Sequence, residues 1–150
     1  MDGSGARAAS RESRDAILQS IHAMLHPRSI AVVGATERLG YGGRLFNNLV
    51  TTGSKARLYP VNPKRETVFG LRCSPTILDV SEPVDLAVIV LPAAQVVPAF
   101  RDCIALGARS ALVISAGFAE LATPDAVARQ SELRALARRS GVRLCGPNCL

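Results

Sequence analysis

Four glycines follow the apolar run at residues 30–33, and glycines at such a position can help to bind a phosphate group. They are Gly34, Gly40, Gly42 and Gly43. Because Gly34 has no side chain, a phosphate could approach its backbone, and glycines at the start of a helix leave the N–H groups there open to an anion. Thr36 adds a hydroxyl group. The spacing of the glycines is not the G-x-G-x-x-G of dinucleotide-binding loops. The loop therefore indicates a ligand that carries phosphate but does not identify that ligand. The alternative is a tight turn that binds nothing.

The residues after the next apolar run, at 56–61, narrow the choice of ligand. An NAD site places an acidic residue there to bind the ribose hydroxyl. This chain instead has Lys64 and Arg65, and its acid, Glu66, comes only after them. A cation suits a phosphorylated ribose, either that of NADP or that of the 3′-phospho-ADP part of coenzyme A (CoA). The alternative is that Lys64 is a solvated lysine in a turn.

The chain offers no complete set of catalytic residues. It lacks a G-x-S-x-G nucleophile motif, and both histidines, His22 and His26, precede the predicted strands, so we expect an ordinary helix surface rather than a metal pair. Glu120 either hydrogen-bonds a ligand or is solvated. The four cysteines lack metal-binding spacing and are expected to be reduced thiols of a cytoplasmic protein; they are Cys73, Cys103, Cys145 and Cys149. We therefore predict a binding module with no catalytic and no metal-binding residues.

The elements that must position these residues alternate between strand and helix. Strands are expected at residues 30–33, 56–61, 86–91, 111–114 and 142–145, and helices at 41–51, 94–106 and 124–140. Runs such as DLAVIVL are apolar throughout, which indicates burial on both faces of a sheet. The pattern predicts an α/β fold with a Rossmann-like, doubly wound parallel sheet of about five strands and flanking helices.

The segments around this core are less regular. Residues 1–12 are expected to be a flexible tail and 13–27 a helix that Pro27 ends. Between residues 62 and 85 the pattern is weaker, with a turn, a short VFGLRCS run and a helical turn near 77–80.

Ligands bind open parallel sheets beyond the carboxyl ends of the strands. The residues expected there are small, polar or turn-forming: Gly34, Ala35 and Thr36; Asn62, Pro63 and Lys64; Pro92 and Ala93; Ser115, Ala116 and Gly117; and Gly146, Pro147, Asn148 and Cys149. A ligand can therefore lie close to the backbone at this edge.

Composition argues against two other classes of partner. The net charge of +6 suggests nucleic acid, but the arginines are scattered and only 4% of residues are aromatic, so neither nucleic acid nor a base-stacking platform is expected. We read the arginines as a solvated face, with a basic patch for a polyanionic small molecule left open. No apolar run has the roughly 18 to 20 residues of a membrane span, and no secretory signal is evident, so we expect a cytoplasmic protein without membrane contact.

Five strings in order resemble the CoA-binding domain of NDP-forming, for example ADP-forming, acyl-CoA synthetases, relatives of the succinyl-CoA synthetase α subunit. They are PRSIAVVGAT, YPVNPKRETVFGLRC, PVDLAVIVLPA, ALVISAGFAE and LCGPNCL. The resemblance implies that residues 28–150 are a CoA-binding, Rossmann-like domain whose cofactor is CoA or acyl-CoA. It also implies that the following synthetase domains, or a further subunit, are partners absent from these residues.

The resemblance further implies which residues bind CoA, with Arg65 as the alternative to Lys64. They are Gly34, Ala35, Thr36, Gly40, Val61, Asn62, Pro63, Lys64, Leu91, Pro92, Ala93, Ser115, Ala116, Gly117, Pro147 and Asn148. In the family the reaction passes through a phosphohistidine on a following domain, a role that neither His22 nor His26 matches. The isolated chain is thus expected to bind without catalysing, within a parent acid–CoA ligase. The alternatives are the NADP-binding domain of an oxidoreductase and the synthetase-like region of a protein acetyltransferase.

Overall fold

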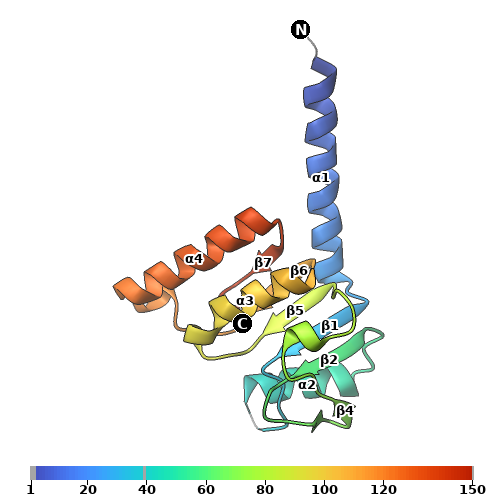
Figure 1. The fold of residues 1–150 in the computed structure, drawn as a ribbon, viewed down its shortest axis with the longest axis vertical. Coiled ribbons are helices and arrows are strands. Elements are labelled where there is room, and N and C mark those ends of the chain that lie inside the picture. The colour runs from blue at the N-terminus through green and yellow to red at the C-terminus, as the bar shows by residue number, and fades with distance from the viewer. Residues whose placement is uncertain (1–2, 39, 150) are drawn as a thin grey trace.

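The computed structural model describes residues 3–38 and 40–149, with side chains from residue 14 onward (Figure 1). In chain order the elements are α1 (Gly3–Leu25), β1 (Ser29–Val33), α2 (Tyr41–Thr51), β2 (Arg57–Val61), β3 (Thr67–Val68), β4 (Leu71–Arg72), the 3₁₀ turn η1 (Ile77–Asp79), β5 (Leu86–Ile89), α3 (Ala93–Leu106), β6 (Ser110–Val113), the 3₁₀ turn η2 (Ala119–Leu121), α4 (Pro124–Ser140) and β7 (Arg143–Cys145).

Five strands form one parallel sheet in the order β2-β1-β5-β6-β7. The chain moves outward from β1 in one direction to β2 and then returns to build β5, β6 and β7 on the other side. The reversal lies between β1 and β5, and such a topological switch point is where open α/β sheets bind ligands. The predicted fold class, a doubly wound parallel sheet of five strands, is confirmed.

Helices cover both faces of this sheet (Figure 1). Met24 of α1 and Phe46 of α2 pack with Ile30 and Val32 on one face, in a cluster that also includes Val88 of β5. On the other face, α3 and α4 pack against alternate residues of the same strands, among them Ala31, Val33, Ala87 and Ile89. The continuous burial of β1 and β5 explains why their sequences are apolar without alternation.

Two of the predicted helices have the expected bounds. Both α2 and α4 begin and end where the sequence indicates. The side chain of Thr123 accepts a hydrogen bond from the N–H of Ala126 at the start of α4, and Pro124 occupies the first turn. Gly141 ends the same helix in the left-handed conformation, which glycine adopts most easily.

Two segments differ from the prediction. Helix α1 begins at Gly3 rather than at residue 13, because the segment expected as a tail is rich in Ala and Arg, which favour helix. Between β2 and β5 the chain forms the antiparallel hairpin β3–β4, with Phe69 and Gly70 at positive φ. Strands of two residues are too short to show periodicity, and phenylalanine is rare at positive φ. The hairpin therefore could not be predicted from the sequence.

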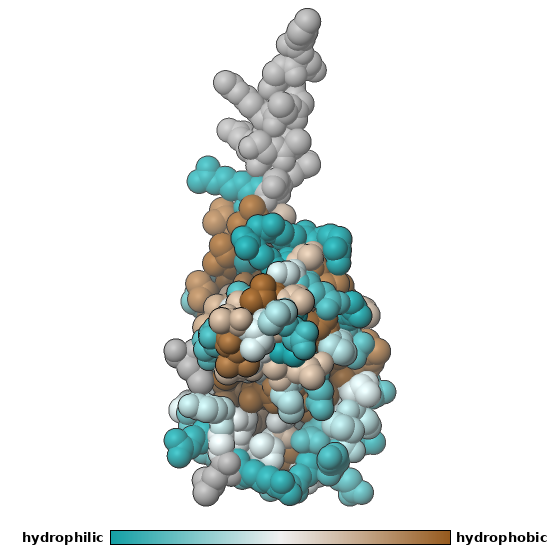
Figure 2. Space-filling view, turned by 90° about the vertical axis from the view of Figure 1, so that its left-hand side faces the viewer, coloured by the Kyte–Doolittle hydropathy of each residue, from teal (hydrophilic) through white to brown (hydrophobic). Residues whose placement is uncertain are grey.

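Helix α1 projects from the body and carries exposed apolar side chains at Ile17, Leu18 and Ile21. Figure 2 shows hydrophobic residues beneath the grey segment at the top, and hydrophilic residues at the opposite end. Among the described residues, no helix combines the length and the apolar character needed to cross a membrane.

Candidate functional site

The carboxyl ends of the five parallel strands meet at one edge of the sheet, as predicted. Hydrogen bonds join the loops that follow them. The N–H groups of Gly34 and Ala35 both donate to the carbonyl of Val61, at 2.9 and 3.3 Å. On the other side, the N–H of Leu91 donates to Oγ of Ser115 at 3.1 Å. The sequence-predicted residues of all five loops thus lie along one continuous rim.

Gly34 is required by the protein's own backbone. It has a φ of +94°, and a Cβ there would lie 2.2 Å from the carbonyl oxygen of Val90. Gly43 of α2 is similar, since a Cβ would lie 2.0 Å from the carbonyl oxygen of Arg38. These glycines let the turn and α2 pack closely. The fold needs glycine at both positions whether or not a ligand binds. The sequence had suggested room for a phosphate; the nearest atoms at Gly34 belong to Val90 and Leu91, just beyond β5.

The turn after β1 is held by local hydrogen bonds. Oγ1 of Thr36 accepts from the N–H of Arg38 at 3.2 Å, and Ala35 is fully buried. Gly40 is the residue before α2, with a φ of +150° and nothing within 4 Å of a Cβ position. The N–H and the carbonyl of Ala35 are both hydrogen-bonded within the protein, so Ala35 shapes the turn, whereas Gly40 has open space beside it.

Asn62 connects two of the loops. Its Nδ2 donates to the carbonyl of Ala35 at 2.8 Å, and its Oδ1 accepts from the N–H of Lys64 at 2.9 Å. The side chain of Val61 faces the core, so only its backbone reaches the rim. Asn62 is therefore a positioning residue that fixes the glycine loop relative to the turn carrying Lys64.

Basic side chains gather beyond the end of β2. Pro63, Lys64, Arg65 and Arg72 line an open cavity of about 770 Å³, together with Glu66. Within the described residues, no ion pair neutralises Lys64, Arg65 or Arg72. Arg72 was missed by sequence reasoning because only the β3–β4 hairpin brings it back to the end of β2. The cavity can hold an anion.

Ser115 connects the loops on the other side of the switch point. It is nearly buried, its Oγ accepts from Leu91, and its carbonyl accepts from the N–H of Asn148 at 3.0 Å. Asn148 has a φ of +54°. These bonds place the turn after β7 against the end of β6, and Pro92 and Ala93 begin α3 beside it.

Glu120 stabilises its own loop. Its Oε1 accepts from the N–H groups of Gly117 and Phe118, at 2.6 and 3.1 Å. The pKa of the carboxyl group is lowered, first by the bond from Gly117 and then by that from Phe118. Arg129 donates to the carbonyl of Gly117 from α4. Of the two alternatives for Glu120, the structure agrees with a solvated residue, since Glu120 is exposed while its carboxylate also holds its own loop. Ala116 is exposed beside it.

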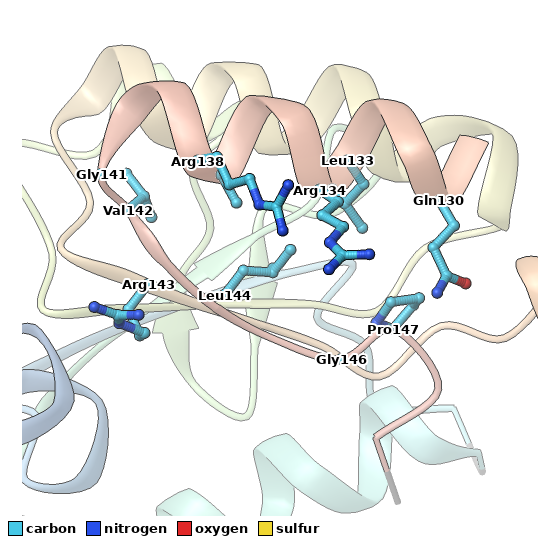
Figure 3. Close-up of a pocket in the computed structure, with 11 residues that line it drawn as sticks. Gln130, Leu133, Arg134, Arg138, Gly141, Val142, Arg143, Leu144, Gly146 and Pro147 are labelled. Carbon is cyan, nitrogen blue, oxygen red and sulfur yellow. The ribbon is translucent and has the colours of Figure 1, made fainter. Parts of the chain in front are cut away.

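A second cavity, of about 470 Å³, lies between α4 and β7 (Figure 3). Arg134 and Arg138 extend from α4 toward Leu144 of β7, and Pro147 lies at the other end of the hollow. Since β2 and β7 are the two edge strands, basic groups flank the rim at both of its ends.

The histidines lie away from this rim. The rings of His22 and His26 are 4.9 Å apart, and with Asp85 they line a hollow where β5 begins, at the opposite end of the sheet. Within the described residues, no three His, Cys, Asp or Glu side chains are grouped so that they could hold a metal ion.

A parallel sheet with a glycine loop and a basic turn at its switch point is the arrangement of a nucleotide-binding domain. Residues 28–150 match the family described as CoA binding domain. The ADP-forming acetate–CoA ligase of Methanocaldococcus jannaschii is 36% identical over 126 residues, covering 83% of this chain and 17% of the ligase. Subunit alpha of the ADP-forming acetate–CoA ligase I of Pyrococcus furiosus is 34% identical over 134 residues, covering 86% of this chain and 29% of the subunit.

A solved structure agrees with these relatives. The acetyl-coenzyme A synthetase 1 of Ca. Korarchaeum cryptofilum, in complex with phosphate and ADP, superimposes with a TM-score of 0.79 at 35% identity, covering 87% of this chain and 28% of that one.

The chain therefore belongs to the CoA-binding domain family, and it is homologous to the CoA-binding module of ADP-forming acyl-CoA synthetases. It spans less than a third of each of these relatives.

Proposed function

We propose that this chain binds coenzyme A or acyl-CoA along the carboxyl rim of its sheet, as the N-terminal module of an NDP-forming acyl-CoA synthetase. The observation that carries the proposal is the cluster of Lys64, Arg65 and Arg72 at the turn that Asn62 connects to the glycine loop of β1. CoA differs from most nucleotides in its ribose 3′-phosphate, and three cations without ion-pair partners in the described residues suit that group.

The nucleotide part of CoA is assigned to the β1–β2 side of the switch point. Backbone groups of the first loop contact the diphosphate, and the β2 turn and the end of β5 flank the nucleotide. The proposed contacts are Gly34, Ala35, Thr36, Gly40, Val61, Asn62, Pro63, Lys64, Leu91, Pro92 and Ala93. Ala35 and Val61 are buried as whole residues, so in this proposal they shape the site from beneath.

The pantetheine arm is assigned to the β6–β7 side. Ser115, Ala116 and Gly117 line its path, and Pro147 and Asn148 form the floor at its end. The bond between Asn148 and Ser115 supports this arrangement because it keeps the two turns together.

In this proposal the chain orients CoA and supplies no reacting group. The acyl transfer and phosphoryl transfer steps belong to further synthetase domains or to a partner subunit, by analogy with relatives that are acetate–CoA ligases or their alpha subunits. The parent protein is then an acid–CoA ligase that couples acyl-CoA thioester chemistry to nucleotide phosphorylation.

A comparison of ligands by thermal shift tests the proposal directly. At about 100 times its Kd, CoA is expected to stabilise the chain by about 2.7 kcal/mol, which raises the Tm by about 5–10 °C. Dephospho-CoA, NADP and NAD at equal concentration should give smaller shifts. A larger shift with NADP would favour the oxidoreductase alternative, and no shift with CoA on folded protein would refute CoA binding.

Lys64→Ala is expected to weaken CoA binding by about 1–2 kcal/mol, the contribution of one charge-assisted hydrogen bond, or roughly 5–30-fold in Kd. Binding of dephospho-CoA should not change, because it lacks the 3′-phosphate. Calorimetry with both ligands measures the difference. Lys55, the other lysine, is exposed at the opposite end of β2, so Lys55→Ala is the matched control. Arg72→Ala should act as Lys64→Ala does, and equal losses for both ligands would contradict the 3′-phosphate assignment.

A further inference from the structure

The sulfur atoms of Cys145 and Cys149 lie 3.4 Å apart, in hydrogen-bond contact. Cys145 ends β7, and Cys149 follows the turn after it. Both residues are half-buried, so a small molecule can reach them. Their sequence spacing gave no reason to expect this contact, since a strand end followed by a turn can separate two side chains in many ways.

The fold of the turn holds the two sulfurs together. Gly146 has a φ of +98°, and a Cβ there would lie 2.3 Å from the carbonyl oxygen of Val113 and 3.4 Å from Cβ of Cys149. Asn148 is bonded to the carbonyl of Ser115. Because β7 pairs with β6 up to Cys145 and Asn148 is bonded to the loop after β6, Cys149 is directed back toward Cys145. A disulfide needs an S–S distance of about 2.05 Å, so the sulfurs would have to approach by about 1.4 Å.

The other two cysteines differ from this pair. Cys73 and Cys103 are buried, and Cys103 has no measurable exposure. Burial raises the pKa of the Cys103 thiol to about 12, and that of Cys73 is also raised by burial. The thiolate is the reacting form, so Cys103 serves as an unreactive internal reference. Cys73 lines the cavity beyond β2 and is the comparison cysteine outside the pair.

We propose that Cys145 and Cys149 form a reactive dithiol that low-molecular-weight disulfides oxidise to an internal disulfide. In the first step one thiol releases its proton to solvent, and its thiolate attacks a sulfur of the small disulfide. The S–S bond of that molecule breaks, and one small thiolate leaves and is protonated. The second protein thiol then releases its proton to solvent, and its thiolate attacks the protein sulfur of the mixed disulfide. The second small thiolate leaves and is protonated. Two protein sulfurs are oxidised, and one small disulfide is reduced to two thiols.

Either thiol can attack first, because the two sulfurs lie in contact with each other and both residues are half-buried. The hydrogen bond with Cys149, and then burial, raise the pKa of Cys145. The thiol that has not attacked acts as the resolving thiol. Pro147 and Asn148, the floor of the proposed pantetheine path, lie between the two cysteines in the chain. The oxidation test below contains no CoA, so its failure and the failure of CoA binding are distinguished by separate measurements.

The test exposes the reduced, folded chain to excess oxidised glutathione at mildly alkaline pH, followed by acid quenching and mass spectrometry. We expect the loss of two hydrogens and no retained glutathionyl group. Trypsin cleavage after Arg143 should place the new bond within one peptide that contains Cys145 and Cys149. A thiol titration of the native chain should show two fewer thiols after oxidation, while Cys103 reacts only after denaturant is added.

Single variants separate the two steps. C145S and C149S should each keep one stably bound glutathionyl group on the remaining cysteine of the pair, because no resolving thiol remains. The proposal is overturned if the wild-type chain retains the glutathionyl group without an internal disulfide, if the new bond includes Cys73 or Cys103, or if all four thiols resist. Peptide mapping of the wild-type chain decides this without relying on the folding of either variant.

Discussion

Gly34→Ala is expected to destabilise the chain by about 3–5 kcal/mol, combining a strained positive φ with overpacking. The added Cβ would meet the carbonyl oxygen of Val90, which belongs to the segment just beyond β5 and cannot rotate away. Relief requires β1 and β5 to separate at the switch point. Thermal unfolding followed by circular dichroism should show a Tm lower by about 10 °C or more.

Gly141→Ala is the matched control for this prediction. Gly141 also has a positive φ, of +74°, but nothing lies within 4 Å of its Cβ position. The substitution should therefore lower the free energy of unfolding by only about 1–2 kcal/mol, the penalty for a side chain at positive φ. Equal losses in the two variants would show that contact with Val90 adds nothing. Because Gly34 is required for folding, loss of CoA binding in a Gly34 variant would not locate the ligand, and Lys64 and Arg72 are the informative positions.

Phe118→Ala is expected to lower the free energy of unfolding by about 3–5 kcal/mol, the usual range for removing a buried aromatic ring. Phe118 is fully buried and belongs to the same core cluster as Leu133 of α4. The guanidinium of Arg129 lies 5.8 Å from the ring centre and also holds the carbonyl of Gly117. The ring thus anchors the loop after β6, which carries three of the proposed pantetheine contacts.

Denaturant unfolding measures this loss. Leu121→Ala, a few residues along the same segment, is the control because Leu121 is 57% exposed and should change stability by less than about 0.5 kcal/mol. Phe118→Leu keeps much of the apolar volume and should lie between the two. If Phe118→Ala unfolds at the same denaturant concentration as Leu121→Ala, the loop is not anchored through this ring.

The alternating sheet and helices could be predicted from the sequence because burial leaves a local signature. Strands such as β5 are apolar throughout, and α4 has its N-cap at Thr123 and its C-cap at Gly141. Parallel strands also place their carboxyl ends together whatever their order, so the rim of candidate residues followed from the sequence as well. The family was predicted from five strings in order and is confirmed by the match over residues 28–150.

Contacts between segments were decided by the tertiary structure. Arg72 joins Lys64 only because the β3–β4 hairpin turns back at Phe69 and Gly70. Glu120 bonds its own loop, Gly34 is required by the backbone at Val90, and Cys149 meets Cys145 because its turn is attached to β6. Periodicity and composition predict which residues of each helix or strand are buried. The distance between two side chains depends on strand order and loop conformation, which arise only when the whole chain packs.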